Sequence, residues 1–147
     1  MARSSKLIAE LVVRLRSVMD FAPIEAAETY TIGQLSTHLR VSLRTLRFYE
    51  QSGLLAPSRE GLRRLYSHDD LERLEVMVTL REFEVSLTAI KSLMAMVDGD
   101  GRVGEREVMD RLEGILADLA EDNRVRIGEL ERINARITDA RTRLSDG

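Results

Sequence analysis

The feature that most constrains the fold lies in the last third of the sequence, where residues 105–144 contain no proline and repeat apolar side chains at steps of four and three. This spacing places the apolar side chains along one seam of a single long helix, as in a coiled coil. The two halves of the seam are out of phase, and continuing the repeat through Asn123 and Arg126 requires a four-residue insertion. We expect a helix from Glu105 to Leu144 that pairs with a second copy of the chain. Its seam consists of Val108, Leu112, Ile115, Leu119, Leu130, Ile133, Ile137, Ala140 and Leu144.

Positive charge is concentrated in one stretch of a chain whose net charge is −3. Between Arg40 and Tyr66 there are six arginines, against the acidic residues Glu50 and Glu60. The planar fork of arginine suits phosphates and guanine edges. This stretch therefore predicts binding to nucleic acid.

Two short helices joined by a tight turn are expected within residues 30–51. Thr31 and Gln34 form the sequence pattern of a capping box that starts the first helix, and Ser42 is an N-cap that starts the second. This is the helix-turn-helix pattern, in which the second helix enters the major groove and presents its first residues to base edges. A solvated helix face without DNA contact is the alternative. The candidate contacts are Ser42, Arg44, Thr45, Arg47 and Tyr49.

A small β-hairpin is expected after the second helix, because Pro57 interrupts helical spacing and the pair Glu60–Gly61 favours a turn. The hairpin would carry Arg63 and Arg64 beside Tyr66. A wing of this kind grips phosphates next to the groove, which adds affinity without reading sequence. The alternative is that Tyr66 packs in the core and the arginines are only solvated.

Four sequence motifs carry a resemblance to a known family. They are VSLRTLRFYEQSGLL at 41–55, SRE at 58–60, RRLYSHDDLERL at 63–74 and EVSLTAIKSLM at 84–94. Together they resemble the MerR family of bacterial transcription regulators. The combination of TLRFYE with RLYS at this spacing is specific, and the resemblance covers roughly residues 30–97.

The resemblance implies a mainly α fold: a winged helix-turn-helix head with a small β-hairpin wing, a second helix pair and a long C-terminal antiparallel coiled-coil helix. We expect an N-terminal extension helix and linker at 1–29, the DNA-binding domain at 30–97, and a loop and dimerisation helix at 98–147. Heads of this family usually start near the position of Tyr30. The amphipathic helix at 4–19 is therefore extra, and we expect it to pack on the head or on the partner's coiled coil.

Individual roles also follow from the resemblance. Phe48 stands where the family commonly has tyrosine, and this departure removes a hydroxyl that could contact a phosphate. Leu62 stands where an aromatic residue is common. The positions that match DNA contacts are Arg44, Thr45, Arg47 and Tyr49 in the recognition helix, and Arg63, Arg64 and Tyr66 in the wing.

The resemblance further implies a homodimer that binds a near-palindromic operator in double-stranded DNA. Such dimers bind between promoter elements set too far apart for RNA polymerase, and they bend and untwist the DNA to realign them, at a cost of order 1–6 kcal/mol. Some relatives repress instead. RNA polymerase at the promoter is therefore a further expected partner.

Other classes of function are disfavoured. Architectural or recombination accessory proteins seldom keep a dimer helix of this length, and a coiled-coil adaptor with a protein-binding head does not need the arginine cluster. No nucleophile–base pair, phosphate loop or pocket-linked carboxylate cluster indicates an enzyme. No apolar run approaches the length of a membrane span. We expect a cytoplasmic protein without a membrane partner.

No cofactor or metal is expected. The chain has no cysteine, which excludes thiolate metal sites and disulfides, and His38 and His68 fall in different motifs. Asp98, Asp100 and Glu107 imitate part of a calcium loop. The first ligand position of such a loop would fall on a methionine, which cannot coordinate calcium, so a solvated turn is expected there.

Overall fold

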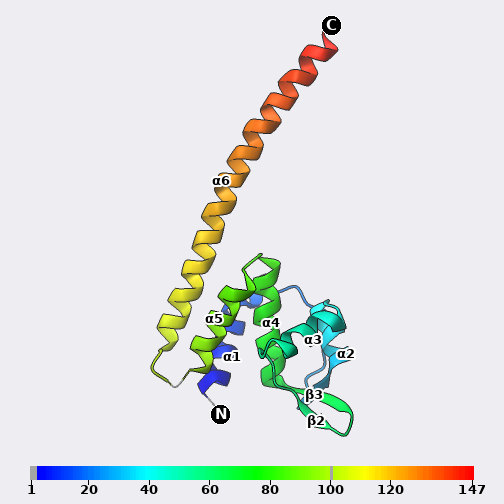
Figure 1. Cartoon of the computed structure of the whole chain (residues 1–147), viewed down its shortest axis with the longest axis vertical. Coiled ribbons are helices and arrows are strands. Elements are labelled where there is room, and N and C mark those ends of the chain that lie inside the picture. The colour runs from blue at the N-terminus through cyan, green and yellow to red at the C-terminus, as the bar shows by residue number, and fades with distance from the viewer. Residues whose placement is uncertain (1–2, 100) are drawn as a thin grey trace. The chain divides into compact units, whose positions relative to one another are not determined.

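The computed structural model describes residues 3–99 and 101–147 and confirms a mainly helical fold (Figure 1). It divides into two compact units, one ending at Arg111 and one spanning Leu112–Gly147. In chain order, the elements are α1 (Arg3–Leu15), the 3-10 helix η1 (Arg16–Val18), β1 (Thr29–Thr31), α2 (Ile32–Leu39), α3 (Leu43–Gln51), β2 (Ser58–Glu60), β3 (Arg63–Ser67), α4 (His68–Glu82), α5 (Leu87–Asp98) and α6 (Glu105–Ser145).

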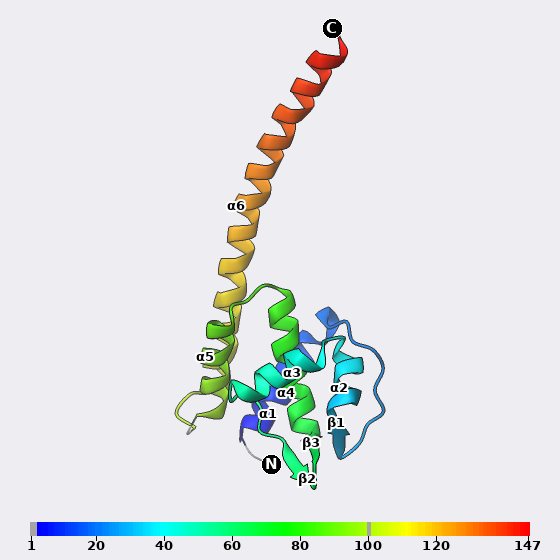
Figure 2. The same ribbon diagram turned by 45° about the vertical axis from the view of Figure 1, so that its right-hand side comes forward.

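The predicted helix-turn-helix is formed by α2 and α3, which lie side by side in Figure 2. The capping box at the start of α2 is complete: Gln34 N donates to Thr31 Oγ1 at 3.2 Å, and Thr31 N donates to Gln34 Oε1 at 2.8 Å. Arg40 ends α2 in the left-handed region at φ 58°. Ser42 Oγ then accepts from Thr45 N at 3.1 Å and starts α3. Local hydrogen bonds therefore set both ends of the turn.

The wing is a hairpin of β2 and β3, and it belongs to a three-stranded antiparallel sheet of order β1-β3-β2. Its loop contains Gly61 at φ 62°, a conformation that favours glycine. The third strand, β1, lies in a stretch expected to be linker and helix cap. Tyr30 of β1 pairs with Tyr66 of β3. Both rings are about 1% exposed, so the sheet contributes its central pair to the core.

The centre of the first unit is α4, which packs against α1, α2, α5, β1 and β3. A capping box of Ser67 and Asp70 starts it. Leu74, Met77 and Leu80 are fully buried. A helix with buried residues on several sides can hold both the sheet and the helix-turn-helix in place.

The N-terminal helix α1 packs against α4 and α5, which confirms the expectation that it packs on the head (Figures 1 and 2). Its apolar face, with Leu7, Ile8, Leu11 and Val12, is 0–5% exposed. Burying such side chains contributes about 1.5–3 kcal/mol each. The helix is thus part of the same compact unit as the winged head.

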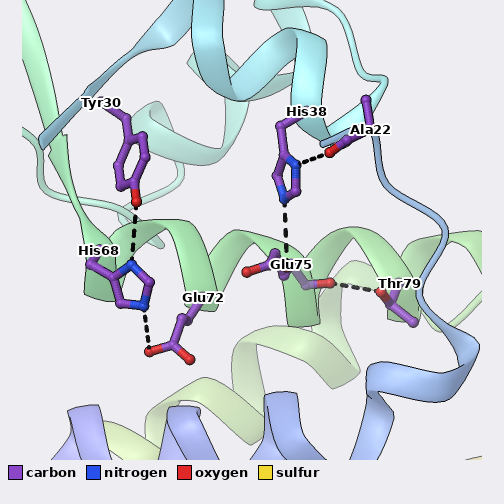
Figure 3. Close-up of polar contacts among 7 residues, drawn as sticks. All are labelled: Ala22, Tyr30, His38, His68, Glu72, Glu75 and Thr79. Atoms are coloured by element: carbon purple, nitrogen blue, oxygen red, sulfur yellow. Dashed lines mark hydrogen bonds and ion pairs between the residues drawn. The ribbon is translucent and has the colours of Figure 1, made fainter. Parts of the chain in front are cut away.

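One histidine contacts the segment between α1 and β1, and the other contacts β1 itself (Figure 3). Buried His38 donates from Nδ1 to the carbonyl of Ala22, and its Nε2 lies 3.5 Å from Glu75 Oε2 on α4. At the other end, the Tyr30 hydroxyl lies 3.4 Å from His68 Nδ1. Each histidine therefore has a local structural partner.

The residues that imitate a calcium loop begin at Asp98, the last residue of α5. Asp98 forms an ion pair with Arg73 of α4, and Asp100 lies outside the described residues. In the described part of the chain, no group of three or more His, Asp or Glu side chains could hold a metal ion. Within the same residues, no helix is both long and apolar enough to cross a membrane.

The long helix is confirmed as α6, 41 residues without interruption. Two residues expected in its dimer seam, Val108 and Leu112, are already buried in the single chain, at 0% and 5% exposure. Val108 therefore belongs to the core of the first unit, and the dimer seam as a whole stays a prediction. Leu130, Ile133 and Ile137 are 50–64% exposed.

Candidate nucleic-acid interface

The first turns of α3 carry two exposed arginines and two hydroxyl groups that form hydrogen bonds within the protein. Arg44 and Arg47 are exposed. Ser42 Oγ lies 3.0 Å from Thr45 Oγ1 in addition to capping the helix. The hydroxyls therefore fix the start of α3, while the guanidinium groups remain accessible to a ligand.

Tyr49, also expected to contact DNA, is only 4% exposed. Burial raises the pKa of its hydroxyl, and the neighbouring Arg81 opposes that shift. Phe48 beside it is 48% exposed. A groove between α3 and the α4–α5 turn brings these side chains together, and it is lined by Arg44, Thr45, Phe48, Tyr49, Arg81 and Leu87.

Glu50 connects α3 to the wing. One carboxylate oxygen, Oε1, accepts from Arg64 Nε at 3.0 Å, and Oε2 accepts from the Tyr66 hydroxyl at 3.2 Å. Arg64 and Tyr66 lie two residues apart on β3, so they share one face of the strand. Burial, together with the negative charge of Glu50, raises the pKa of Tyr66 to about 12. The hydroxyl of Tyr66, expected in the wing contact, is used within the protein.

A second hollow lies between the start of α2, α3 and the wing. Arg47 comes from α3, and Arg63 and Arg64 come from β3. Arg63 is exposed, and Arg64 is partly exposed despite its bond to Glu50. Arginines far apart in the sequence thus converge on one surface that suits a phosphate. The full lining is Thr31, Ile32, Arg47, Leu62, Arg63 and Arg64.

Sequence reasoning missed three residues of this surface, namely Glu50, Arg81 and Leu87. Glu50 was counted only as a negative charge, although its place on α3 beside an alternating Arg-x-Tyr strand was a possible signal. Arg81 and Leu87 reach the α3 groove from the α4–α5 turn. No local pattern signals that approach, because it depends on how α4 packs.

Comparison with known proteins identifies the head. Residues 30–97 match the profile described as MerR HTH family regulatory protein. The chain is 30% identical over 112 residues to the HTH-type transcriptional regulator ZntR homolog of Haemophilus influenzae, covering 75% of this chain and 79% of that protein. This chain belongs to the MerR family. A second MerR-family relative, the mercuric resistance operon regulatory protein of Bacillus cereus, is 30% identical over 116 residues, covering 78% and 84% of the two chains.

A solved MerR structure agrees with this assignment. The structure is of HiNmlR, a MerR family regulator lacking the sensor domain, bound to promoter DNA. It has 27% sequence identity and a TM-score of 0.51, over 71% of this chain and 76% of that chain. As a MerR-family member, the present chain is a DNA-binding transcription regulator with a winged helix-turn-helix head. The matched MerR region begins at Tyr30, so α1 lies outside it.

Proposed function

We propose that α3 enters the major groove of double-stranded DNA and that Arg44 reads base edges there. Arg44 lies in the first turn of α3 and is exposed, and bidentate contact with guanine is the commonest specific use of arginine. Ser42 and Thr45 hold the start of this helix beside the DNA backbone. Sequence preference therefore depends on the first turn of α3.

The observation that carries the proposal is the convergence of Arg47, Arg63 and Arg64 on one hollow. We assign this hollow to backbone phosphates that flank the groove, where charge-assisted hydrogen bonds give affinity without reading sequence. Tyr49 and Tyr66 contribute to the interface indirectly. Tyr49 lines the α3 groove, and Tyr66 donates a hydrogen bond to Glu50, which also accepts one from Arg64.

We also propose that the regulator is a homodimer on a near-palindromic operator. One nine-residue recognition helix reads few base pairs, and two heads related by a two-fold axis read two half-sites. Residues 30–97 serve as the DNA-binding domain, 98–147 as the dimerisation segment, and 1–29 as an extension that covers the head. The seam lies among the apolar residues of α6, which include Ile115, Leu116, Leu119, Leu130, Ile133, Ile137 and Leu144.

The dimer acts in the cytoplasm, without enzymatic activity, by bending promoter DNA within reach of RNA polymerase. The promoter-bound MerR neighbour and the family profile favour this function over that of an accessory protein or an adaptor.

The test compares arginine variants on selected and random duplexes. Fragments retained by the pure protein are sequenced to find the operator. Arg44→Ala should then weaken operator binding by about 1–3 kcal/mol and relax sequence preference. Arg63→Ala should weaken binding to all duplexes alike and reduce the salt slope by about one.

Arg124→Ala is the matched control. Arg124 is 77% exposed on α6 and pairs with Glu121, so its removal changes net charge by the same amount outside the proposed interface. Equal losses of operator affinity in Arg44→Ala and Arg124→Ala would show that the loss comes from the change in net charge alone. Retention of random fragments alone would contradict a sequence-specific regulator.

A further inference from the structure

The inference concerns the polar residues in the middle of α6. Because α6 is one uninterrupted helix, its seam can be followed through the centre. When Leu116 takes the place of Ile115, steps of three and four alternate to the end without an insertion. The resulting seam is Leu116, Leu119, Asn123, Arg126, Leu130, Ile133, Ile137, Ala140 and Leu144. Two polar positions, Asn123 and Arg126, interrupt an otherwise apolar seam.

We propose that Asn123 and Arg126 form a polar layer at the two-fold axis of an antiparallel α6 dimer, in which Asn123 faces Arg126 of the partner subunit. The antiparallel direction is the one that the family resemblance implies, and this layer sets the register of the helix pair. The inference rests on the proposed homodimer and adds which residues of the two helices meet.

The charge of Arg126 agrees with the antiparallel direction. In a parallel pair, equivalent seam positions face each other, so Arg126 would face Arg126 of the partner subunit inside the seam. Two guanidinium groups that face each other there would repel. In an antiparallel pair, Arg126 can meet Asn123 of the partner subunit, whose side-chain oxygen accepts from the guanidinium.

The register follows from matching polar to polar and apolar to apolar. When Asn123 meets Arg126 of the partner subunit, the flanking layers are apolar on both sides. These layers pair Leu119 with Leu130 of the partner subunit and Leu116 with Ile133 of the partner subunit.

The neighbouring registers leave the polar groups without polar partners. A slip of one heptad in one direction places Asn123 against Ile133 of the partner subunit and Arg126 against Leu130 of the partner subunit. A slip in the other direction places Leu119 against Asn123 of the partner subunit. A polar side chain left against an apolar one loses hydration without a hydrogen bond, which disfavours both slips.

Acidic residues near the layer offset its charge. Asp122 precedes Arg126 by four residues and Glu129 follows it by three, so helical spacing puts both carboxylates within one turn. The methylene stem of Arg126 can cover the apolar seam while its head reaches them. A polar layer of this kind lowers stability but specifies the register and orientation of a coiled coil.

Cysteine cross-linking tests the register in the full-length chain, which has no native cysteine. Leu119→Cys/Leu130→Cys places two thiols that face each other between subunits only in the proposed register. Within one chain they lie about 16 Å apart along the helix, too far for a disulfide. Mild oxidation should give a disulfide-linked dimer. Leu116→Cys/Ile133→Cys is a second pair in the same register, in case the first weakens the dimer.

Two comparison variants define the outcomes that overturn the proposal. Leu119→Cys/Ile137→Cys reports a slip of one heptad, and Leu119→Cys alone reports a parallel pair. We expect neither to cross-link. A linked dimer from either one, or none from both pairs of the proposed register, contradicts the assignment.

The role of the polar layer is tested by Asn123→Leu/Arg126→Leu. In this background the slipped pair at 119 and 137 should also cross-link, because nothing then distinguishes the registers, and thermal unfolding should move to higher temperature. A slipped pair that stays unlinked would show that other contacts set the register. DNA binding is measured separately: correct cross-linking without DNA binding leaves the register intact and contradicts only the proposed function.

Discussion

At the scale of single residues, Glu50 is the carboxylate on which the candidate interface depends most. It accepts from Arg64 and from the Tyr66 hydroxyl, and so links the recognition helix to the wing. The two tyrosines expected at the DNA, Tyr49 and Tyr66, are 4% and 1% exposed. In this head, the partly exposed Arg64 is held by Glu50, whose own side chain is 18% exposed.

Glu50→Ala should lower the free energy of unfolding by about 1–3 kcal/mol, because the buried Tyr66 hydroxyl loses its acceptor. Glu50→Gln keeps an amide oxygen in the same place and should cost less. Urea denaturation followed by circular dichroism measures both variants. Equal stability of Glu50→Ala and the wild type would show that Glu50 does not hold the wing.

Tyr66 also predicts a pH dependence. Its pKa in the folded state is about 12, above the ordinary tyrosine value of about 10, so folding favours the protonated hydroxyl. This stabilisation is fully present below about pH 10 and is lost as the pH rises toward the folded-state pKa. In Tyr66→Phe, the decline in unfolding free energy over this alkaline range should be smaller than in the wild type. Denaturation curves at several alkaline pH values give the unfolding free energy of each protein. If this free energy fell equally steeply with pH in both proteins, the assignment would be contradicted.

At the scale of elements, α1 is a structural part of the head although it lies outside the family match. It packs against α4 and α5, and α4 in turn contacts β3 and α2. Stability of α1 therefore supports the elements that carry the arginines. The α4–α5 turn has a related role, since Arg81 and Leu87 form one wall of the α3 groove.

Leu11→Ala should destabilise the head by about 2–5 kcal/mol, because Leu11 is 0% exposed and its truncation leaves a cavity under α1. Val13→Ala is the matched control, since Val13 on the same helix is 66% exposed. Thermal unfolding of the two variants should separate them clearly. If both changes have the same small effect, α1 does not contribute to the head's stability.

At the scale of the whole molecule, the proposed homodimer would bind its operator by pairing two heads through α6. The proposed polar layer at Asn123 and Arg126 gives that pairing one register, which in turn fixes the spacing of half-sites the dimer can read. Substitutions in the seam should therefore affect DNA binding without touching a DNA contact.

Leu119→Asp should convert the dimer into a monomer, because it buries an unpaired carboxylate in the seam. Operator affinity should fall, and the slope of log affinity against log salt should drop to about half, since a monomer contacts half the phosphates. Ala117→Asp, at an exposed position off the seam, carries the same charge and should leave both unchanged. Light scattering and salt titrations supply the two measurements. If the Leu119→Asp protein remains dimeric, α6 does not form the dimer interface as proposed.

The sequence by itself determined the features governed by local interactions. The cap residues Thr31 and Ser42 satisfy backbone groups within one turn, so they marked helix starts correctly. The absence of proline and the repeated seam predicted α6 to within one residue of its observed end. The motifs in residues 30–97 identified the family, and the turn at Gly61 placed the hairpin.

Only the tertiary structure decided which distant groups meet. The pairing of Tyr30 with Tyr66, the packing of α1 on α4 and the burial of Val108 join segments that no local pattern connects. Arg47 and Arg63 were both named from the sequence, yet their convergence on one hollow depends on how α3 docks against the sheet. Apolar burial, which is not directional, drives such docking, so its partners are fixed by the complete core and not by any one segment.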